Sequence, residues 1–210
     1  MQSYKNGQQK FMVFIRISFI SLIIFLLFAC EKPKVAQIET PQTPATVADK
    51  FAYPIGKSEF VTEAKDSKDD WYNARNLGED NHLGEDWNKN SGGNTDCGEP
   101  VYAIGNGVIT YAQDAGEGWG NVVIIEHTLP DGTRIESLYG HLQEILKTSG
   151  EVKFREQIAK VGNANGKYLC HLHLEIRDES CLMWNQVGGG YSGERTGWLD
   201  PSEFIDKHRN

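Results

Sequence analysis

Two short runs of this chain carry side chains that commonly bind metal ions. His171 and His173 are one residue apart, and in an extended segment residues i and i+2 project from the same face. His82 and Asp86 are four residues apart in a stretch rich in Gly and Asn, which favours loop or extended chain over helix. In extended chain these two side chains also return to one side. The two runs therefore offer imidazole and carboxylate groups that could grip one ion.

This set of groups is typical of a zinc site. Imidazole and carboxylate ligands suit Zn²⁺, and three protein ligands leave a fourth tetrahedral position for water, as in catalytic sites. From the spacing alone, either His171 or His173 could complete the set with His82 and Asp86. Each run also has a plainer interpretation, namely two half-buried histidines of a sheet and a solvated acidic loop. Cys170 and the residue after His171 should face the opposite, buried side, so that Cys170 is not expected to be a ligand.

Short strands must position these residues. Segments rich in Val, Ile and Tyr alternate with Gly-containing turns. The expected strands are residues 100–104, 107–112, 121–126, 134–139, 157–161 and 172–176. Short helices are expected near residues 69–74, 142–146 and 201–207. Closely spaced strands with Gly turns predict an all-β, mainly antiparallel fold.

The N-terminus is typical of an export signal. Three basic residues precede residues 17–29, a run of 13 residues without charge. A membrane-spanning helix needs about 20 apolar residues, whereas the core of a secretory signal needs roughly 7–15. We therefore predict a signal peptide over residues 1–29. Counting back to Phe11 gives 19 residues, which leaves an uncleaved membrane anchor open.

Residues 27–30 (LFAC) resemble the signal of bacterial lipoproteins, in which the cysteine is lipidated and becomes the first residue. The alternative is a plain signal peptide followed by an incidental cysteine. We predict a lipidated Cys30 that begins a flexible tether over residues 30–50, followed by the folded domain over residues 51–210. The protein would then be a membrane-anchored lipoprotein of the cell envelope, facing the periplasm or the cell exterior.

The charge of the exported part excludes one class of partner. Residues 30–210 hold 18 basic and 29 acidic residues, a net charge of −11. Proteins that bind nucleic acid through its phosphates need a basic surface. We therefore expect no nucleic acid partner.

Three motifs occur in a fixed order along the chain: residues 82–86 (HLGED), 139–142 (YGHL) and 171–175 (HLHLE). Together they resemble the lysostaphin/LytM-type zinc endopeptidases, which cut peptide bonds within bacterial peptidoglycan. The resemblance covers about residues 68–206 and implies a mainly antiparallel β-sheet core with an open groove and short peripheral helices.

The resemblance also implies roles for five residues. His82, Asp86 and His173 would be the zinc ligands, and His141 and His171 would be the catalytic pair beside the metal. One of the pair would accept a proton from water, and the other would stabilise the oxyanion and protonate the leaving amine. The resemblance does not assign these two tasks.

The function implied is a zinc-dependent endopeptidase that hydrolyses peptide bonds in cell-wall peptidoglycan. Two alternatives are a wall-binding regulator of another hydrolase that does not cut, and a zinc peptidase that acts on a protein substrate. The chain could also have a regulatory protein partner.

Other residues have open interpretations. Tyr72, Arg75 and Trp87 could line a substrate groove, but ordinary packing explains them equally well. Cys97, Cys170 and Cys181 permit at most one internal disulfide in an oxidising compartment and leave one cysteine over. The short separation of Cys170 and Cys181 would make their pairing easy, but the sequence does not decide the pairing.

Overall fold

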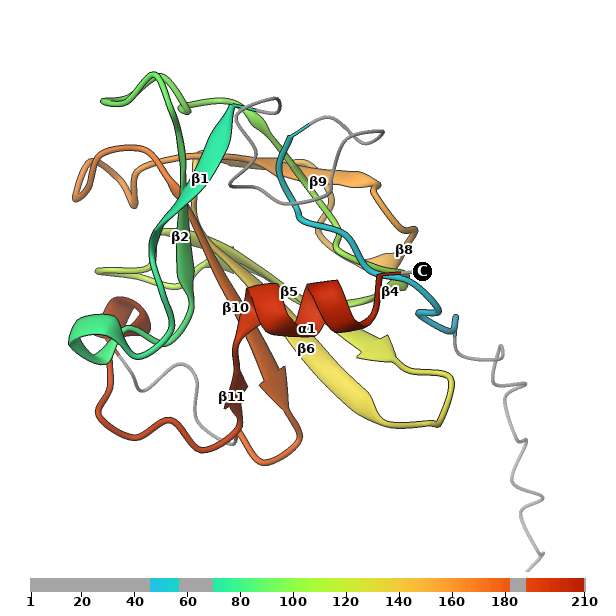
Figure 1. Ribbon diagram of the computed structural model, residues 1–210. Helices are drawn as coiled ribbons and strands as arrows, with labels where there is room; N and C mark the ends of the chain where they lie inside the picture. Colours follow the sequence, from blue (N-terminus) through green and yellow to red (C-terminus); the bar gives the residue numbers. More distant parts are fainter. Residues whose placement is uncertain (1–45, 57–69, 182–187, 210) are drawn as a thin grey trace, which may run out of the picture. The chain divides into compact units, whose positions relative to one another are not determined.

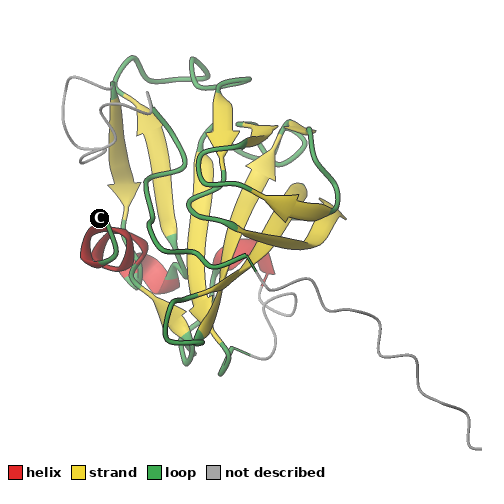
Figure 2. Ribbon diagram, turned by 90° about the vertical axis from the view of Figure 1, so that its right-hand side faces the viewer, coloured by secondary structure: helices red, strands yellow, loops and turns green. Residues whose placement is uncertain are grey.

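Two antiparallel β-sheets dominate the computed structural model, which describes residues 46–56, 70–181 and 188–209 (Figures 1 and 2). The larger sheet has the order β1-β2-β10-β6-β5-β4-β8, with β11 on β10, and the smaller has the order β3-β9-β7. The larger sheet contains β1 (Trp71–Arg75), β2 (Glu85–Lys89), β4 (Gly107–Asp114), β5 (Asn121–Thr128), β6 (Arg134–Leu142), β8 (Gly150–Val152), β10 (Leu172–Asp178) and β11 (Trp198–Leu199). The smaller contains β3 (Pro100–Tyr102), β7 (Glu144–Ile145) and β9 (Gln157–Lys160). The predicted all-β, mainly antiparallel class is confirmed.

One of the three predicted helices forms. Helix α1 spans Pro201–Lys207, with the Asp200 side chain accepting a hydrogen bond from the Glu203 N–H at 2.9 Å and proline at its first position. Short 3₁₀ turns occur at Glu79–Asn81 and Gly188–Gly190. The predicted helix near residues 142–146 is wrong, because β6 continues to Leu142 and the next residues form β7 on β9.

The predicted helix near residues 69–74 is also wrong, although residue 69 lies outside the described part. Residues from Trp71 onward form β1, which pairs with β2 so that Trp71 lies opposite Lys89. Trp71 is buried and Tyr72 exposed, which is the alternation of a strand. Burial of Trp71 against the main core therefore outweighs the local helical preference that the sequence indicates.

The central strands of the larger sheet are buried on both faces. In β5, Val123 and Ile125 belong to the main hydrophobic core, whereas Val122 and Ile124 pack in a second cluster with Trp119 on the other face. This separation follows the two-residue period of a strand.

The same alternation sorts the side chains of β10. Leu172 and Leu174 enter the main core, and Cys170 just before the strand does so too, as predicted. His173 therefore points to the opposite face, where its ring contacts that of Trp119 at a centroid distance of 5.5 Å. The candidate site thus lies on the face of the sheet that is turned away from the main core.

Residues 46–56 pack against the sheets. Phe51 and Ile55 are buried, and the Arg155 guanidinium donates to the backbone carbonyls of Ile55 and Gly56 at 3.2 and 2.8 Å. The last residues of the predicted tether, 46–50, already contact the domain, because the Ala48 N–H donates to the carbonyl of Thr128 at 2.8 Å.

The remainder of the predicted tether, the predicted signal peptide and Cys30 lie outside the described residues. Within the ranges that the structure describes, no helix is long and apolar enough to cross a membrane.

Candidate metal centre and peptidase site

Strand register builds the centre of the candidate site. Arg75 of β1 lies opposite Asp86 of β2, Asp86 lies opposite His173 of β10, and His173 lies opposite Gly140 of β6. Directly opposed residues of an antiparallel pair project from the same face. One row across four strands therefore carries a guanidinium, a carboxylate and an imidazole, and ends at a glycine.

A register shift between Asn73 and Arg75 places Arg75 in this row of opposed residues. The shift places Arg75, and not Ala74, opposite Asp86. A β-bulge of this kind redirects the side chain that follows it. Arg75 consequently faces the same side of the sheet as Asp86.

His82 reaches this row from the loop that precedes β2. It directly follows the 3₁₀ turn Glu79–Asn81, and its backbone N–H donates to the carbonyl of Glu79 at 2.9 Å. Gly84 lets the chain pass close to β10, since a Cβ at this position would lie 2.2 Å from the carbonyl oxygen of Leu174. The glycine in the HLGED run thus permits the close approach that brings His82 over Asp86.

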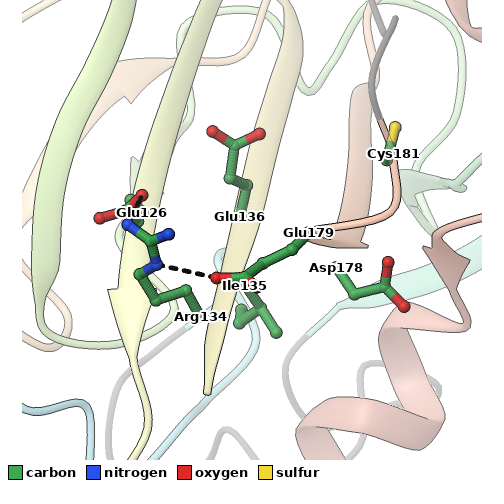
Figure 3. A pocket seen from close by; sticks show the side chains of 7 residues that line it. All are labelled: Glu126, Arg134, Ile135, Glu136, Asp178, Glu179 and Cys181. Carbon is green, nitrogen blue, oxygen red and sulfur yellow. Dashed lines mark hydrogen bonds and ion pairs between the residues drawn. The ribbon is translucent and has the colours of Figure 1, made fainter. Parts of the chain in front are cut away.

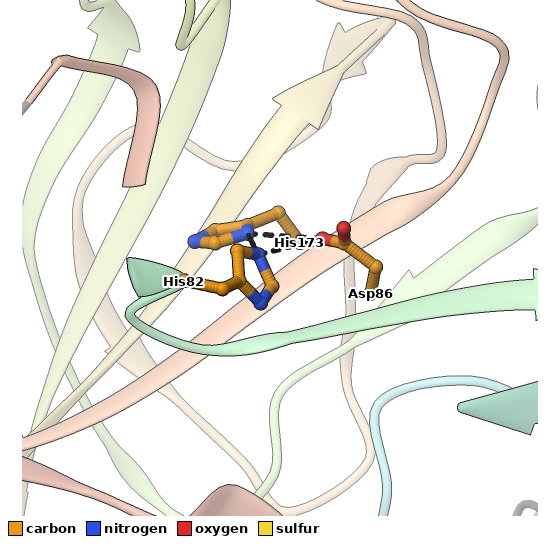
Figure 4. Close-up of side chains that lie close together, drawn as sticks. All are labelled: His82, Asp86 and His173. Carbon is orange, nitrogen blue, oxygen red and sulfur yellow. Dashed lines mark hydrogen bonds and ion pairs between the residues drawn. The ribbon is translucent and has the colours of Figure 1, made fainter. Parts of the chain in front are cut away.

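His82, Asp86 and His173 form a close triangle of ligand atoms (Figure 4). His82 Nε2 lies 2.9 Å from His173 Nδ1, and each of these nitrogens lies 3.1 Å from Asp86 Oδ1. Ligands bound tetrahedrally at zinc–nitrogen and zinc–oxygen distances of 2.0–2.1 Å are about 3.3 Å apart. The triangle therefore fits a zinc ion with small adjustments of the side chains.

Burial and hydrogen bonds shift the ionisation of this trio. Burial alone would raise the pKa of Asp86, but hydrogen bonds from His173 and His82 outweigh it and hold the pKa well below its usual value. Burial alone would lower the pKa of His173, but its bonds to Asp86 and Glu175 raise it to about 9. In the metal-free protein at neutral pH, Asp86 is therefore a carboxylate and His173 an imidazolium. A metal ion that binds His173 Nδ1 would displace a proton.

Glu175 orients the His173 ring through Nε2, the nitrogen that does not face Asp86. Its Oε1 lies 3.0 Å from His173 Nε2, while its Oε2 accepts a hydrogen bond from the Trp198 indole at 2.8 Å and lies 3.6 Å from Arg177. Such carboxylates commonly fix the ring and the tautomer of a metal-binding histidine. This role was not predicted from the sequence, although Glu175 follows His173 by two residues and so shares its face of the strand.

His141 and His171 lie beside the triangle. Both can present a nitrogen within 4.8 Å of a carboxylate oxygen of Asp86, and His171 Nε2 is 3.5 Å from Asp86 Oδ1. Their rings contact each other edge to face at a centroid distance of 4.7 Å. All five residues singled out in the sequence are therefore brought together. Asp86, His141 and His171 form a second group able to hold a metal.

Backbone carbonyls fix the tautomers of both histidines. His141 Nδ1 donates to the carbonyl of Trp119 at 3.1 Å, and His171 Nδ1 donates to the carbonyl of Leu169 at 2.8 Å. A carbonyl oxygen can only accept, so the hydrogen must be on Nδ1 and the lone pair of each neutral ring on Nε2. Burial lowers the pKa of both rings, most strongly that of His141, which keeps them neutral near pH 7.

A pocket opens beside these groups. Its lining combines site residues with polar and aromatic neighbours: Ala74, Arg75, Asp86, Asn88, His141, Tyr168, His171 and Tyr191. The side chains of Asp86 and His171 are 12% and 13% exposed, whereas those of His82 and His173 are fully buried. Solvent and ligands therefore approach the triangle from the side of Asp86 and His171.

The three residues that could line a substrate groove, Tyr72, Arg75 and Trp87, have different environments in the structure. Arg75 lines this pocket, and Trp87 is buried in the main core. Tyr72 is exposed on β1. Tyr168 and Tyr191 line the pocket but were not singled out in the sequence, because no spacing pattern distinguishes them.

A second pocket lies elsewhere on the larger sheet and contains no histidine (Figure 3). Within it, Arg134 Nε donates to Glu179 Oε1 at 2.9 Å. The other residues that line it are Glu126, Ile135, Glu136, Asp178 and Cys181. None of the five predicted site residues contributes to it.

A disulfide between Cys97 and Cys170 holds the chain next to the site. Cys170 immediately precedes His171, and its N–H donates to the Asn94 side chain at 2.9 Å. Cys181 takes no part in this bond, so the expectation of one disulfide and one remaining cysteine is confirmed. The easy pairing of Cys170 with Cys181 does not occur.

Comparison with known families agrees with this arrangement. The family model described as peptidase family M23 matches residues 81–185, which include all five site residues. This chain belongs to peptidase family M23. The predicted resemblance to the lysostaphin/LytM-type peptidases is thereby confirmed.

Relatives of this M23 chain include proteins named as lipoproteins. It is 41% identical over 81 residues to the outer membrane antigenic lipoprotein B of Histophilus somni, which covers 38% of this chain and 23% of that protein. It is 37% identical over 81 residues to lipoprotein NlpD of Yersinia enterocolitica, covering 38% of this chain and 78% of that protein. The chain thus matches about a quarter of the length of the Histophilus relative.

Two solved structures of peptidases are also similar to this chain. The catalytic domain of lysostaphin from Staphylococcus simulans has 26% identity and a TM-score of 0.44, covering 59% of this chain and 78% of that one. A zinc-containing peptidase from Vibrio cholerae has 25% identity and a TM-score of 0.41, covering 61% of this chain and 37% of that one.

Proposed function

We propose that this M23 chain is a zinc-dependent endopeptidase that hydrolyses peptide bonds in bacterial cell-wall peptidoglycan. The observation that carries the proposal is the grouping of four histidines around one carboxylate, that of Asp86. His82 and His173 lie 3.1 Å from Asp86 Oδ1, and His171 lies 3.5 Å from the same atom. His141 completes the group through its contact with His171.

His82, Asp86 and His173 are the proposed zinc ligands. A zinc ion in this position would supply Lewis acidity for a carbonyl oxygen and would make water more acidic. Glu175 favours zinc binding at His173. Once Nδ1 is a ligand, the hydrogen of His173 is on Nε2, and Nε2–H can donate a hydrogen bond to Glu175. The buried His82 Nδ1 has no hydrogen-bond partner among the described residues.

His141 and His171 are the proposed catalytic pair. Each donates its Nδ1–H to a backbone carbonyl, so each presents Nε2 as the atom that can take up a proton. A neutral imidazole held in this way can accept the proton of the attacking water and later return it to the leaving amine. The protonated form can also donate a hydrogen bond to the oxyanion that forms during hydrolysis.

We further propose that the protein acts at the cell envelope as a lipoprotein. The support is the lipoprotein-like run that ends at Cys30, together with relatives that are named as lipoproteins. Peptidoglycan lies within reach of a protein tethered there. Replacement of Cys30 with Ser should release the protein from membranes or block its processing.

Digestion of purified peptidoglycan by the zinc-loaded protein tests the proposal. Mass analysis of the released fragments should show peptides with new amino and carboxyl ends. A protein that binds the wall and leaves every peptide bond intact would support a regulator that does not cut. Cleavage of a protein substrate in place of peptidoglycan would assign a different peptidase activity.

A further inference from the structure

We propose that Arg75 forms a subsite for a carboxylate of the substrate, on the residue next to the scissile bond. The inference rests on the proposed endopeptidase function and adds a specificity to it. It starts from the row of register partners in which Arg75 lies opposite Asp86 and faces the same side of the sheet. Arg75 therefore stands one strand away from the proposed ligand Asp86 and two strands away from His173.

Arg75 is the basic group of the pocket. Among the described residues that line the pocket, it is the one lysine or arginine, and Asp86 is the one carboxylate. When Asp86 serves as a metal ligand, its charge is engaged by the cation. The guanidinium then determines the charge that the rest of the pocket favours, within a protein whose residues 30–210 are strongly acidic.

The hydrogen bond to Tyr191 uses one nitrogen of the Arg75 guanidinium. Its Nη1 donates to the Tyr191 hydroxyl at 2.5 Å, and within the described part of the chain no carboxylate forms an ion pair with it. A guanidinium has five N–H donors in a planar fork, which suits bidentate binding of a carboxylate. Arg75 thus keeps other N–H donors for a ligand while Nη1 is held by Tyr191.

The position of Arg75 beside the proposed catalytic residues indicates that its ligand is part of the substrate. The pocket that Arg75 lines is also lined by Asp86, His141 and His171. A peptide whose scissile bond lies at the two histidines would bring the adjacent residue to Arg75. A guanidinium binds a carboxylate more strongly than the uncharged carboxamide, so this contact would distinguish the two forms.

The test uses two synthetic peptides that differ in one group, a carboxylate or its carboxamide, on the residue next to the scissile bond. Zinc-loaded wild-type protein should cut the carboxylate peptide with a kcat/KM at least about tenfold higher, the range of a hydrogen bond to a charged group. Arg75→Gln should cut both peptides equally, at about the carboxamide rate of the wild type. Arg75→Lys should keep part of the preference, because it retains the charge without the fork.

Lys89→Gln is the matched control. It removes one positive charge from β2, next to β1, and Lys89 pairs with Glu99 at 2.8 Å and does not line the pocket. This variant should keep the full preference. Equal cleavage of both peptides by the wild type, or an undiminished preference in Arg75→Gln, would overturn the proposal.

A binding measurement separates this proposal from the proposed function. The dissociation constants of both peptides are measured by calorimetry with zinc-loaded His141→Ala, which should bind the peptide and cut it too slowly to disturb the measurement. Tighter binding of the carboxylate form, lost when Arg75→Gln is added, would support the subsite even if the wild type cut neither peptide. Equal binding of the two forms would refute the subsite and leave the peptidase proposal untouched.

Discussion

Asp86 and His173 are register partners on the adjacent strands β2 and β10, and Asp86 Oδ1 lies 3.1 Å from His173 Nδ1. Their contact depends directly on how the two strands pair. A slip of one residue would turn one of the two side chains into the main core. Burial of Leu172 and Leu174 in that core opposes such a slip. Hydrophobic packing on one face thus determines the geometry of the polar site on the other.

The first prediction concerns the metal. Replacement of His82, Asp86 or His173 with Ala should each strip zinc during mild dialysis, because two ligands hold zinc much more weakly than three. His127→Ala is a control for loss of a buried histidine, since His127 lies outside both metal-binding groups. Metal content is measured by atomic absorption. Stoichiometric zinc in His173→Ala would contradict the assignment and reopen His171 as the ligand.

A second prediction concerns the carboxylate behind His173. Glu175→Gln should weaken zinc binding by about 10–100-fold, because it removes the charged acceptor that orients the His173 ring. Competition with a chromophoric chelator measures the affinity. Glu85→Gln is the matched control, since Glu85 is equally buried on β2 but bonds to Ser202. Equal affinities of the Glu175 variant and the wild type would show that the contact does not affect the metal.

Stability should depend on pH through His127. Burial lowers the pKa of this histidine to about 4, while Nδ1 bonds to the Asn106 carbonyl and Nε2 to Ser137. Between pH 6.5 and 4 the unfolded chain binds the proton more readily, so stability falls as the pH falls through this window. The loss attributable to His127 is about 3 kcal/mol.

Urea unfolding at several pH values measures this effect. His127→Gln removes the titrating group, and its free energy of unfolding should decrease less between pH 6.5 and pH 4 than that of the wild type. The other ionisable groups are common to both proteins and cancel in the comparison. Parallel pH profiles for the two proteins would show that His127 does not contribute.

The disulfide should stabilise the fold. Cys97 and Cys170 are 73 residues apart, so their bond closes a long loop of the unfolded chain. Replacing both with Ala should lower the free energy of unfolding by about 2–5 kcal/mol. Cys181→Ser keeps the disulfide and serves as the control. Unchanged stability of the double variant in denaturant titrations would argue against the bond.

Local sequence patterns predict much of this fold but not its long-range contacts. Alternating Val and Ile residues locate β5, and the cap at Asp200 with Pro201 locates α1. Strand β1 escapes prediction, because its form depends on pairing with β2 and on burial of Trp71. A short edge strand carries too few residues for its period to be recognised.

For the site, too, local spacing predicts part of the arrangement and long-range strand pairing decides the rest. The spacing of His171 and His173 predicts that both face one side, and both lie within 3.5 Å of Asp86. The spacing alone does not distinguish the two. The pairing of β2 with β10 does, since it puts His173 opposite Asp86 and leaves His171 just before the strand. Arg75 likewise depends on a bulge that no spacing rule reveals.

The most direct test of the account is the rate of cross-link cleavage by zinc-loaded His141→Ala and His171→Ala proteins. Both variants should fold and keep zinc, because the triangle of His82, Asp86 and His173 does not include them. Each should lose about 10²–10⁴ in the rate of peptidoglycan hydrolysis, and the double variant should lose less than the product of the two single losses. Full activity of a zinc-loaded His141→Ala or His171→Ala protein would contradict the account.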